Sequence, residues 1–343
     1  MDVILKKKRD SNIEILRIVS MILIILHHFT WYSDINIKID IYKNILVPGS
    51  QIAINCFILI TGYFLINSEF KIKKLLKIVL ETVFYSIIIF VIFCIFDAHN
   101  FSWDRLQMNF LPITHKLYCF FTNYIILYCL FPFINIMLKQ LSKKQFKILL
   151  FILIGIFSII PTIISSSSIY SELAWFITVY CIGAYIRLNG NKYFKNLKLN
   201  LCIFIIGYVI VISSIILFSI YKIMPIQRFG QLNKLPIVII SINLFLIFLN
   251  IKVMNNKIIN TISQCTFGVY LIHEHYLIRE FLWKYLFNAS RITSSLKLIM
   301  YAVAVTFIVY IVCTMIDLIR EKLIEEPVFK LIDKIEIKNN KLQ

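Results

Sequence analysis

The chain has 343 residues, of which 59% are hydrophobic and 16% are charged, and its mean hydropathy is +0.82. Soluble domains carry about 25% charged and about 45–50% apolar residues, so a single water-soluble core could not hide this much apolar surface. Lys and Arg outnumber Asp and Glu by 36 to 18. The basic residues lie in short clusters between long apolar runs, which indicates membrane topology and argues against nucleic-acid binding.

The apolar runs predict an all-helical membrane protein. A helix needs about 17–25 apolar residues to cross the hydrocarbon layer. Ten runs come close to or reach this length, and in chain order they cover residues 13–31, 44–66, 75–96, 117–138, 146–164, 170–188, 199–221, 235–250, 258–285 and 298–319. The eighth run is the weakest, because it is short and begins next to Pro236. We therefore expect a bundle of about ten transmembrane helices.

The charges between the runs predict how this bundle is oriented. With the N-terminus inside, the segments assigned to the cytoplasm hold 24 Lys and Arg, and those assigned to the outside hold 10. This asymmetry places both termini in the cytoplasm of a multi-pass protein of the cell membrane. The loop with Lys222, Arg228 and Lys234 is a local exception, and it could instead be an outer basic patch that faces anionic glycan or lipid.

The chain shows no linker between separate domains. We expect one membrane domain over residues 1–343, with a helical core at about 13–326 and no appended soluble domain. All eight cysteines lie in apolar runs and none forms a CxxC pair. Cysteines in such places are usually small hydrophobic residues, so we expect neither a disulfide framework nor a metal site.

The first run contains Arg17, His27 and His28, and ionisable residues inside a membrane helix usually serve function. Arg17 and His28 are eleven residues apart, which is three helical turns plus about 20°, so they share a face about 16 Å apart along the axis. A permanent cation near the cytoplasmic mouth suits a phosphate-bearing donor, and a deeper histidine suits proton transfer. The alternative is an arginine that snorkels to the interface and a polar helix end.

Further polar residues flank the third and tenth runs. Lys74 and Lys77 are three residues apart and share a helix face. They could bind donor phosphates or only hold their loop inside. After the tenth run, Glu325 and Glu326 precede Pro327, which we expect to end the helix.

The ninth run carries Tyr270, His273, Glu274 and His275. On one continuous helix, His273 and His275 lie about 200° apart and could not both ligate one metal ion. Tyr270 and His273 are three residues apart and could together line a polar cavity.

Taken together, six segments in this order resemble those of the acyltransferase-3 family, membrane enzymes that acylate bacterial surface polysaccharides. The segments are Ile13–Arg17 followed by His28, Phe57–Leu65, Tyr118–Asn135, Leu173–Arg187, Thr266–Glu274 and Glu325–Pro327. The chain departs from the family pattern at Thr61, where Ser is usual, and at Cys119, where Trp is usual. It is similar to the short, single-domain members, the type that includes the enterobacterial common antigen O-acetyltransferase.

The resemblance implies a reaction and residues for it. Acetyl-CoA, or another acyl-CoA, would be the donor substrate. The acceptor would be a sugar hydroxyl of a cell-surface or lipid-linked polysaccharide. Membrane lipid would surround the protein as a further partner. His28 would carry the chemistry, supported by Arg17 and by Glu325 of the terminal motif. The donor-binding residues would be Arg17, Lys74 and Lys77, and the substrate cavity would be lined by Tyr63, Trp175, Tyr270 and His273.

Two mechanisms are compatible with this assignment. His28 could take the proton from the acceptor hydroxyl, or it could accept the acyl group as a transient acyl-imidazole. A function from another class is a glycan or lipid translocator that uses the membrane histidines and carboxylates as a proton relay. Such transporters often have paired broken helices in two repeated halves, and no such repeat is seen in the sequence.

Overall fold

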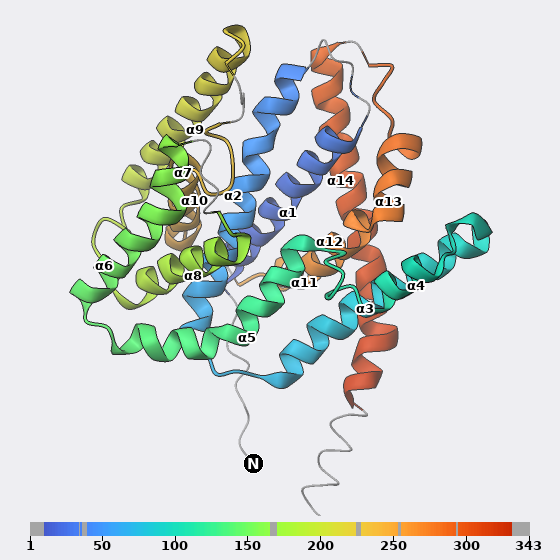
Figure 1. Ribbon diagram of the computed structural model, residues 1–343, viewed down its shortest axis with the longest axis horizontal. Coiled ribbons are helices and arrows are strands. Elements are labelled where there is room, and N and C mark those ends of the chain that lie inside the picture. Colours follow the sequence, from blue (N-terminus) through green and yellow to red (C-terminus); the bar gives the residue numbers. More distant parts are fainter. Residues whose placement is uncertain are drawn as a thin grey trace, which may run out of the picture.

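A computed structural model of the chain describes residues 10–33, 35, 40–164, 170–223, 228–252, 255–292 and 294–330. In this part of the chain every regular element is a helix, and the helices form one bundle (Figure 1). The basic run at residues 6–9 and the tail after residue 330, on which the predicted orientation partly depends, lie outside the described residues. The cytoplasmic position of both termini stays a prediction.

Seven helices in the described residues are long and apolar enough to cross a membrane, and they coincide with seven of the predicted runs. They are α1 (Ser11–Tyr32), α2 (Asp40–Leu65), α3 (Ile72–Phe96), α5 (Cys119–Gln140), the continuous run α6–η3–α7 (Lys143–Ile163), α9 (Leu197–Ile220) and α14 (Ser295–Arg320) with its extension. The number of long spans is thus smaller than the predicted ten.

The three remaining runs account for the difference. Two of them are helices too short for a full crossing by this criterion: α8 (Glu172–Leu188) has 17 residues and α10 (Leu235–Asn250) has 16. The prediction of one continuous helix over residues 258–285 is wrong. That segment consists of α11 (Lys257–Gln264), α12 (Thr266–Glu274), α13 (Tyr276–Glu280) and the π-helical η4 (Phe281–Leu286).

The break between α12 and α13 occurs at His275, whose ψ of 130° leaves the helical region. Its ring Nδ1 accepts the backbone N–H of Leu277 at 3.4 Å, as the oxygen of a helix-capping side chain would. Its Nε2–H then donates to Asn109 Oδ1 at 3.0 Å, in the short helix α4 (Trp103–Phe110). A buried side chain therefore ends α12 at Glu274 and starts α13 in a new direction.

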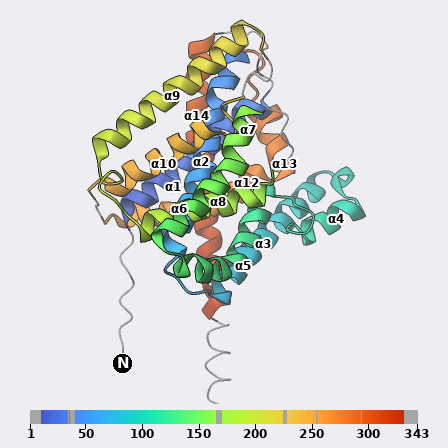
Figure 2. The same cartoon turned by 60° about the vertical axis from the view of Figure 1, so that its left-hand side comes forward.

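The helices differ in how deeply they lie in the bundle. The apolar span of α2 is 67% buried, whereas that of α9 is 11% buried. Figures 1 and 2 both show α9 at the edge. Its outward side chains are apolar, and Ile206 and Val209 expose 60% and 56% of their surface. Such a helix is stable when lipid, instead of water, contacts its outer face.

Two glycines let α2 and α8 approach to backbone contact. A Cβ at Gly62 would overlap the carbonyl group of Tyr180, and a Cβ at Gly183 would overlap the carbonyl oxygen of Leu59. Close approach through small residues is a common way for membrane helices to associate, because it maximises van der Waals contact. Each glycine lies in a segment of the sequence resemblance, and in this structure each serves packing.

Two of the three basic residues in the exceptional loop cap a helix. Arg228 donates to the carbonyl of Ile163 at 2.6 Å, and Lys234 donates to the carbonyl of Pro161 at 2.6 Å. Both carbonyls belong to the C-terminal turn of α7 (Ile160–Ile163), where carbonyls lack helical partners. These contacts give Arg228 and Lys234 a structural role in the bundle.

The end of α14 also differs from expectation. The chain passes through a π-helical turn, η5 (Glu321–Glu325), and stays helical to Lys330, so the prediction that Pro327 ends the helix is wrong. A π-helical turn shifts the hydrogen-bond pattern of the backbone by one residue. The missing N–H of Pro327 falls directly after this shift, where the regular pattern is already interrupted.

Candidate functional site

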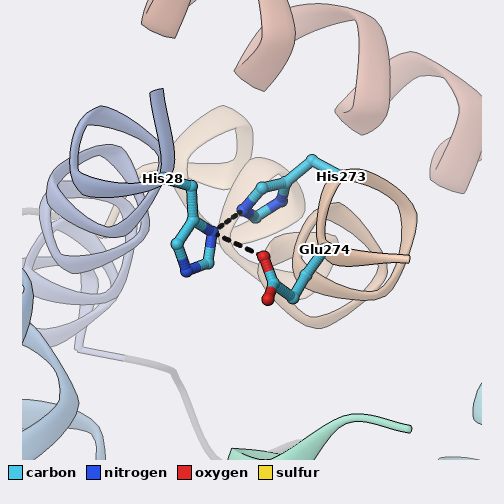
Figure 3. Close-up of side chains that lie close together, drawn as sticks. All are labelled: His28, His273 and Glu274. Carbon is cyan, nitrogen blue, oxygen red and sulfur yellow. Dashed lines mark hydrogen bonds and ion pairs between the residues drawn. The ribbon is translucent and has the colours of Figure 1, made fainter. Parts of the chain in front are cut away.

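Three side chains from two helices meet where α1 passes α12. His28 of α1 places its Nδ1 3.0 Å from His273 Nε2 and 3.0 Å from Glu274 Oε2 (Figure 3). His273 is fully buried, and the side chains of His28 and Glu274 are each 13% exposed. We call His28, His273 and Glu274 the His28 cluster. The structure thereby brings together two predicted site residues, His28 and His273.

The hydrogen bonds of His273 define the proton positions in this cluster. His273 Nδ1 lies 2.6 Å from the backbone carbonyl of Val269. A carbonyl can only accept, so Nδ1 carries the proton and the Nε2 of neutral His273 is an acceptor. His28 Nδ1–H therefore donates to His273, which leaves the lone pair of His28 on Nε2. Figure 3 shows this Nε2 pointing away from both partners.

Arg279 of α13 holds Glu274 from the other side. Its guanidinium donates to Glu274 Oε1 at 3.0 Å and to the Tyr32 hydroxyl at 3.2 Å, and it lies 4.5 Å from the centre of the Tyr32 ring. The Tyr32 ring is 5.7 Å from that of His28. Glu274 Oε2 is buried and accepts no hydrogen bond of good geometry from the described residues. A carboxylate is thus fixed beside His28, and its Oε2 lies 3.0 Å from His28 Nδ1.

Chemically, this arrangement suits a general base. A histidine whose Nδ1–H is held by an acceptor presents a basic Nε2, and a nearby carboxylate stabilises the imidazolium that forms when Nε2 takes a proton. The same orientation also suits Nε2 as a nucleophile.

The predicted residues Lys77 and Glu325 meet in a second ionic cluster, formed by α3 and the end of α14. The guanidinium of Arg320 contacts Asp317 at 2.8 Å, Glu325 at 2.7 Å and Glu81 at 3.1 Å. Glu325 also pairs with Lys77. We call these five residues the Arg320 cluster. Glu325 therefore lies among structural ion pairs at the end of α14, in a cluster separate from His28.

The other two predicted donor-binding residues also have contacts within the protein. Arg17 pairs with Glu14 at 3.3 Å, and Glu14 in turn accepts a hydrogen bond from Ser263 of α11. The ammonium group of Lys74 lies 5.6 Å from the centre of the Tyr128 ring. Arg17 keeps 32% of its side-chain surface exposed.

The four residues predicted to line a substrate cavity are not gathered at one place. Tyr270 lies beside His273, with ring centres 6.1 Å apart. Trp175 is fully buried and donates to Asn55 Oδ1 at 3.0 Å, between α8 and α2. Tyr63 accepts a hydrogen bond from Arg187 at 2.9 Å. Of this set, His273 contacts His28, and Tyr270 lies beside His273.

Sequence reasoning did not assign roles to Glu274, Arg279 and Tyr32. All three lie near histidines that it did single out, because Glu274 follows His273 directly and Tyr32 is four residues after His28. The i,i+4 spacing of His28 and Tyr32 was a signal available in the sequence. The contact of Arg279 with Glu274 was not, because it depends on the break at His275.

Comparison with known protein families gives one result that covers most of the chain. The profile of the acyltransferase-3 family, described as an acyltransferase domain, matches residues 10–318. No curated protein and no solved structure matches the chain. The matched region includes the His28 cluster and all seven long apolar helices, in part or in whole. The chain therefore belongs to the acyltransferase-3 family and is a multi-pass membrane acyltransferase.

Proposed function

We propose that the protein moves an acyl group, acetyl in the favoured case, from acyl-CoA to a sugar hydroxyl of a cell-surface or lipid-linked polysaccharide. The observation that carries this proposal is the contact of His28 Nδ1 with His273 and Glu274, from which we infer the tautomer of His28. Its Nδ1–H is held by His273 at 3.0 Å, and its Nε2 points away from the cluster. A family of acyltransferases needs a group that activates an acceptor, and we assign this role to His28 Nε2.

In the proposed reaction, His28 Nε2 takes the proton of the sugar hydroxyl. The hydroxyl oxygen forms a bond to the thioester carbonyl carbon, and the bond from that carbon to sulfur breaks. The CoA thiolate then takes the proton back from Nε2 and leaves as a thiol. Glu274, 3.0 Å from Nδ1, stabilises the imidazolium between these two proton transfers.

The donor phosphates are proposed to lie near Arg17, Lys74 and Lys77. Lys77 pairs with Glu325, and Arg17 pairs with Glu14. A donor phosphate would therefore have to replace these carboxylates as the partner of each cation. Arginine can hold phosphate with two parallel hydrogen bonds, so Arg17 is the stronger of these contacts.

The route through an acyl-imidazole uses the same histidine. Here Nε2 attacks the thioester, CoA leaves, and the acceptor hydroxyl later takes the acyl group from the ring. Incubation of the purified protein with radiolabelled acetyl-CoA and no acceptor separates the routes. Label that stays on the protein after denaturation, and that His28→Ala lacks, would establish the covalent route.

The proposal is tested by the acyl content of the cell's glycans. We expect a deletion strain to lose O-acyl groups from one surface polysaccharide, as measured by mass spectrometry, and the parent gene to restore them. His28→Ala should restore less than about one-hundredth of them, because removing a general base lowers the rate by about 10²–10⁴-fold. His27→Gln, on the same helix, is the matched control and should restore them fully.

Two outcomes would overturn the proposal. Unchanged O-acylation in the deletion strain would favour a translocator of glycan or lipid. Full activity of His28→Ala would remove His28 from the chemistry whatever the substrate is. Western blotting of membrane fractions distinguishes an inactive variant from an absent one.

A further inference from the structure

The His28 cluster also has the geometry of a site for a divalent transition-metal ion. One ligand atom from each of His28, His273 and Glu274 lies within 4.8 Å of the other two. The two distances from His28 Nδ1 are both 3.0 Å. Figure 3 shows the three side chains converging on one point from α1 and α12.

The hydrogen bonds around the cluster leave the right atoms available as ligands. The Val269 carbonyl holds the proton of His273 on Nδ1, so Nε2 carries the lone pair that a metal ion requires. Arg279 occupies Glu274 Oε1, which leaves Oε2. This Oε2 is buried and without a hydrogen bond of good geometry in the described structure. It forms an ion pair with His28 Nδ1 at 3.0 Å, and a metal ion between the two residues would be a partner of better geometry for both atoms.

Two of the three distances between ligand atoms are close to those of zinc sites. Zinc lies about 2.0–2.2 Å from imidazole nitrogen and carboxylate oxygen, so tetrahedral ligand atoms are about 3.4 Å apart. The contacts of 3.0 Å need to lengthen by a few tenths of an ångström. The ligand atoms of His273 and Glu274, which lie within 4.8 Å of each other, would move to the same separation when zinc binds. Two imidazoles and one carboxylate with a fourth position open form a common zinc ligand set.

We propose that Zn²⁺ binds reversibly to His28, His273 and Glu274 and inhibits acyl transfer. The inhibition rests on the proposed function, in which His28 Nε2 is the base. Zinc would bind the lone pair of His28 Nδ1, and the ring proton would move from Nδ1 to Nε2. The ring stays neutral and no proton is lost. A protonated Nε2 can neither accept the hydroxyl proton nor attack a thioester.

The expectation of no metal site came from the cysteines, which form no CxxC pair, and His273 and His275 could not bind one ion from a continuous helix. The proposed ligands instead combine His273 with His28 from another helix. The charge of Arg279, 3.0 Å from Glu274 Oε1, opposes a second cation nearby. This repulsion favours a weakly held, exchangeable ion over a permanent one.

Binding is tested with Co²⁺, which replaces zinc and absorbs visible light when tetrahedral. The full-length protein in lipid nanodiscs is first treated with chelator. We expect one Co²⁺ per chain with visible bands that Zn²⁺ removes, and no thiolate-to-cobalt bands from the cysteines. His273→Gln and Glu274→Gln should each lose the bands. His27→Gln should keep them, because the His27 ring stacks on Trp31 at 5.9 Å and is not one of the three ligands.

Inhibition is measured separately, as release of CoA from acetyl-CoA in zinc buffers. We expect turnover to fall as site occupancy rises and chelator to restore it. Absence of stoichiometric binding, or bands that persist in both His273→Gln and Glu274→Gln, would overturn the site. Binding without inhibition, or activation by zinc, would overturn the inhibitory role. No turnover under any condition, with Co²⁺ binding intact, would count against the proposed function and leave the metal site standing.

Discussion

The Arg320 cluster and the His28 cluster are both ionic and largely buried, yet they differ in how completely their polar atoms are satisfied. The guanidinium of Arg320 contacts a different carboxylate through each nitrogen, those of Asp317, Glu325 and Glu81. In the His28 cluster, Glu274 Oε2 has no hydrogen bond of good geometry from the described residues, and the Nε2 of His28 points away. The first arrangement holds helices together, and the second keeps atoms available for chemistry.

The two clusters are joined through α12. A Cβ at Gly268 would overlap the carboxylate of Asp317, so this glycine lets α12 lie directly on the Arg320 cluster. His273 is five residues further along α12, about 7.5 Å along the axis. The Arg320 cluster therefore supports α12, the helix that carries His273 and Glu274 of the His28 cluster.

Replacement of Arg320 should have the largest effect, and it should act on folding. Arg320→Met leaves the buried Glu81 and Asp317, and the half-buried Glu325, without their main cation. Removing one partner of a buried ionic network lowers the free energy of unfolding by about 3–5 kcal/mol. We expect this loss in denaturant titrations of the purified protein in nanodiscs. Lys322→Met, an exposed neighbour, is the control and should change stability little. Equal stability of the two variants would mean that the Arg320 cluster is not structural.

Replacement of Glu274 should show the opposite profile. Glu274→Gln keeps the shape of the side chain but removes the charge beside His28 Nδ1. We expect kcat to fall about 100-fold, because the imidazolium loses its counterion, with a free energy of unfolding close to that of the parent. The measurement is CoA release at saturating acyl-CoA together with a denaturant titration. A large loss of stability with normal kcat would mean that Glu274 has a structural role, as the Arg320 cluster does.

Replacement of Gly268 tests whether the Arg320 cluster positions α12, and with it the His28 cluster. Gly268→Ala forces the new methyl group against Asp317, so α12 must shift away from α14. A displacement below 1 Å at His273 should lower kcat about tenfold while KM for acyl-CoA stays near the parent value. Gly155→Ala is the matched control, because a Cβ there meets no neighbouring atom within 4 Å. If both variants have parental kcat, the position of α12 does not depend on this contact.

The sequence could predict those parts of the fold that depend on local residues, and it missed those that depend on contacts between distant residues. Seven apolar runs became long helices, because length and hydropathy are properties of local sequence. The ninth run did not, since its break depends on a hydrogen bond between His275 and Asn109, which are 166 residues apart. Hydropathy does not register such a contact, and no glycine or proline marks the position.

For the site, spacing within one helix identified His28 as a candidate, but its partners came from elsewhere in the chain. His28 and His273 are 245 residues apart, and Glu274, the last residue of α12, lies beside His28 together with His273. Glu325 was expected near the chemistry on its motif alone. Its pairing with Arg320, five residues away, arises from the π-helical turn η5, which spacing rules for an α-helix do not anticipate.

The smallest effect is expected at Lys77, which could have a structural role, a role in donor binding, or both. It pairs with Glu325 in the Arg320 cluster, and it is also a proposed contact of the donor phosphates. Its side chain is 41% exposed, so water and salt weaken either interaction. We expect Lys77→Met to raise KM for acyl-CoA about threefold with kcat unchanged, because a phosphate contact at such a surface contributes less than about 1 kcal/mol. Lys147→Met, at an exposed site on α6 (Lys143–Ile154), is the control and should leave KM unchanged. An unchanged KM for Lys77→Met, with a lower free energy of unfolding, would mean that Lys77 has only a structural role. Donor binding would then rest on Arg17 and Lys74.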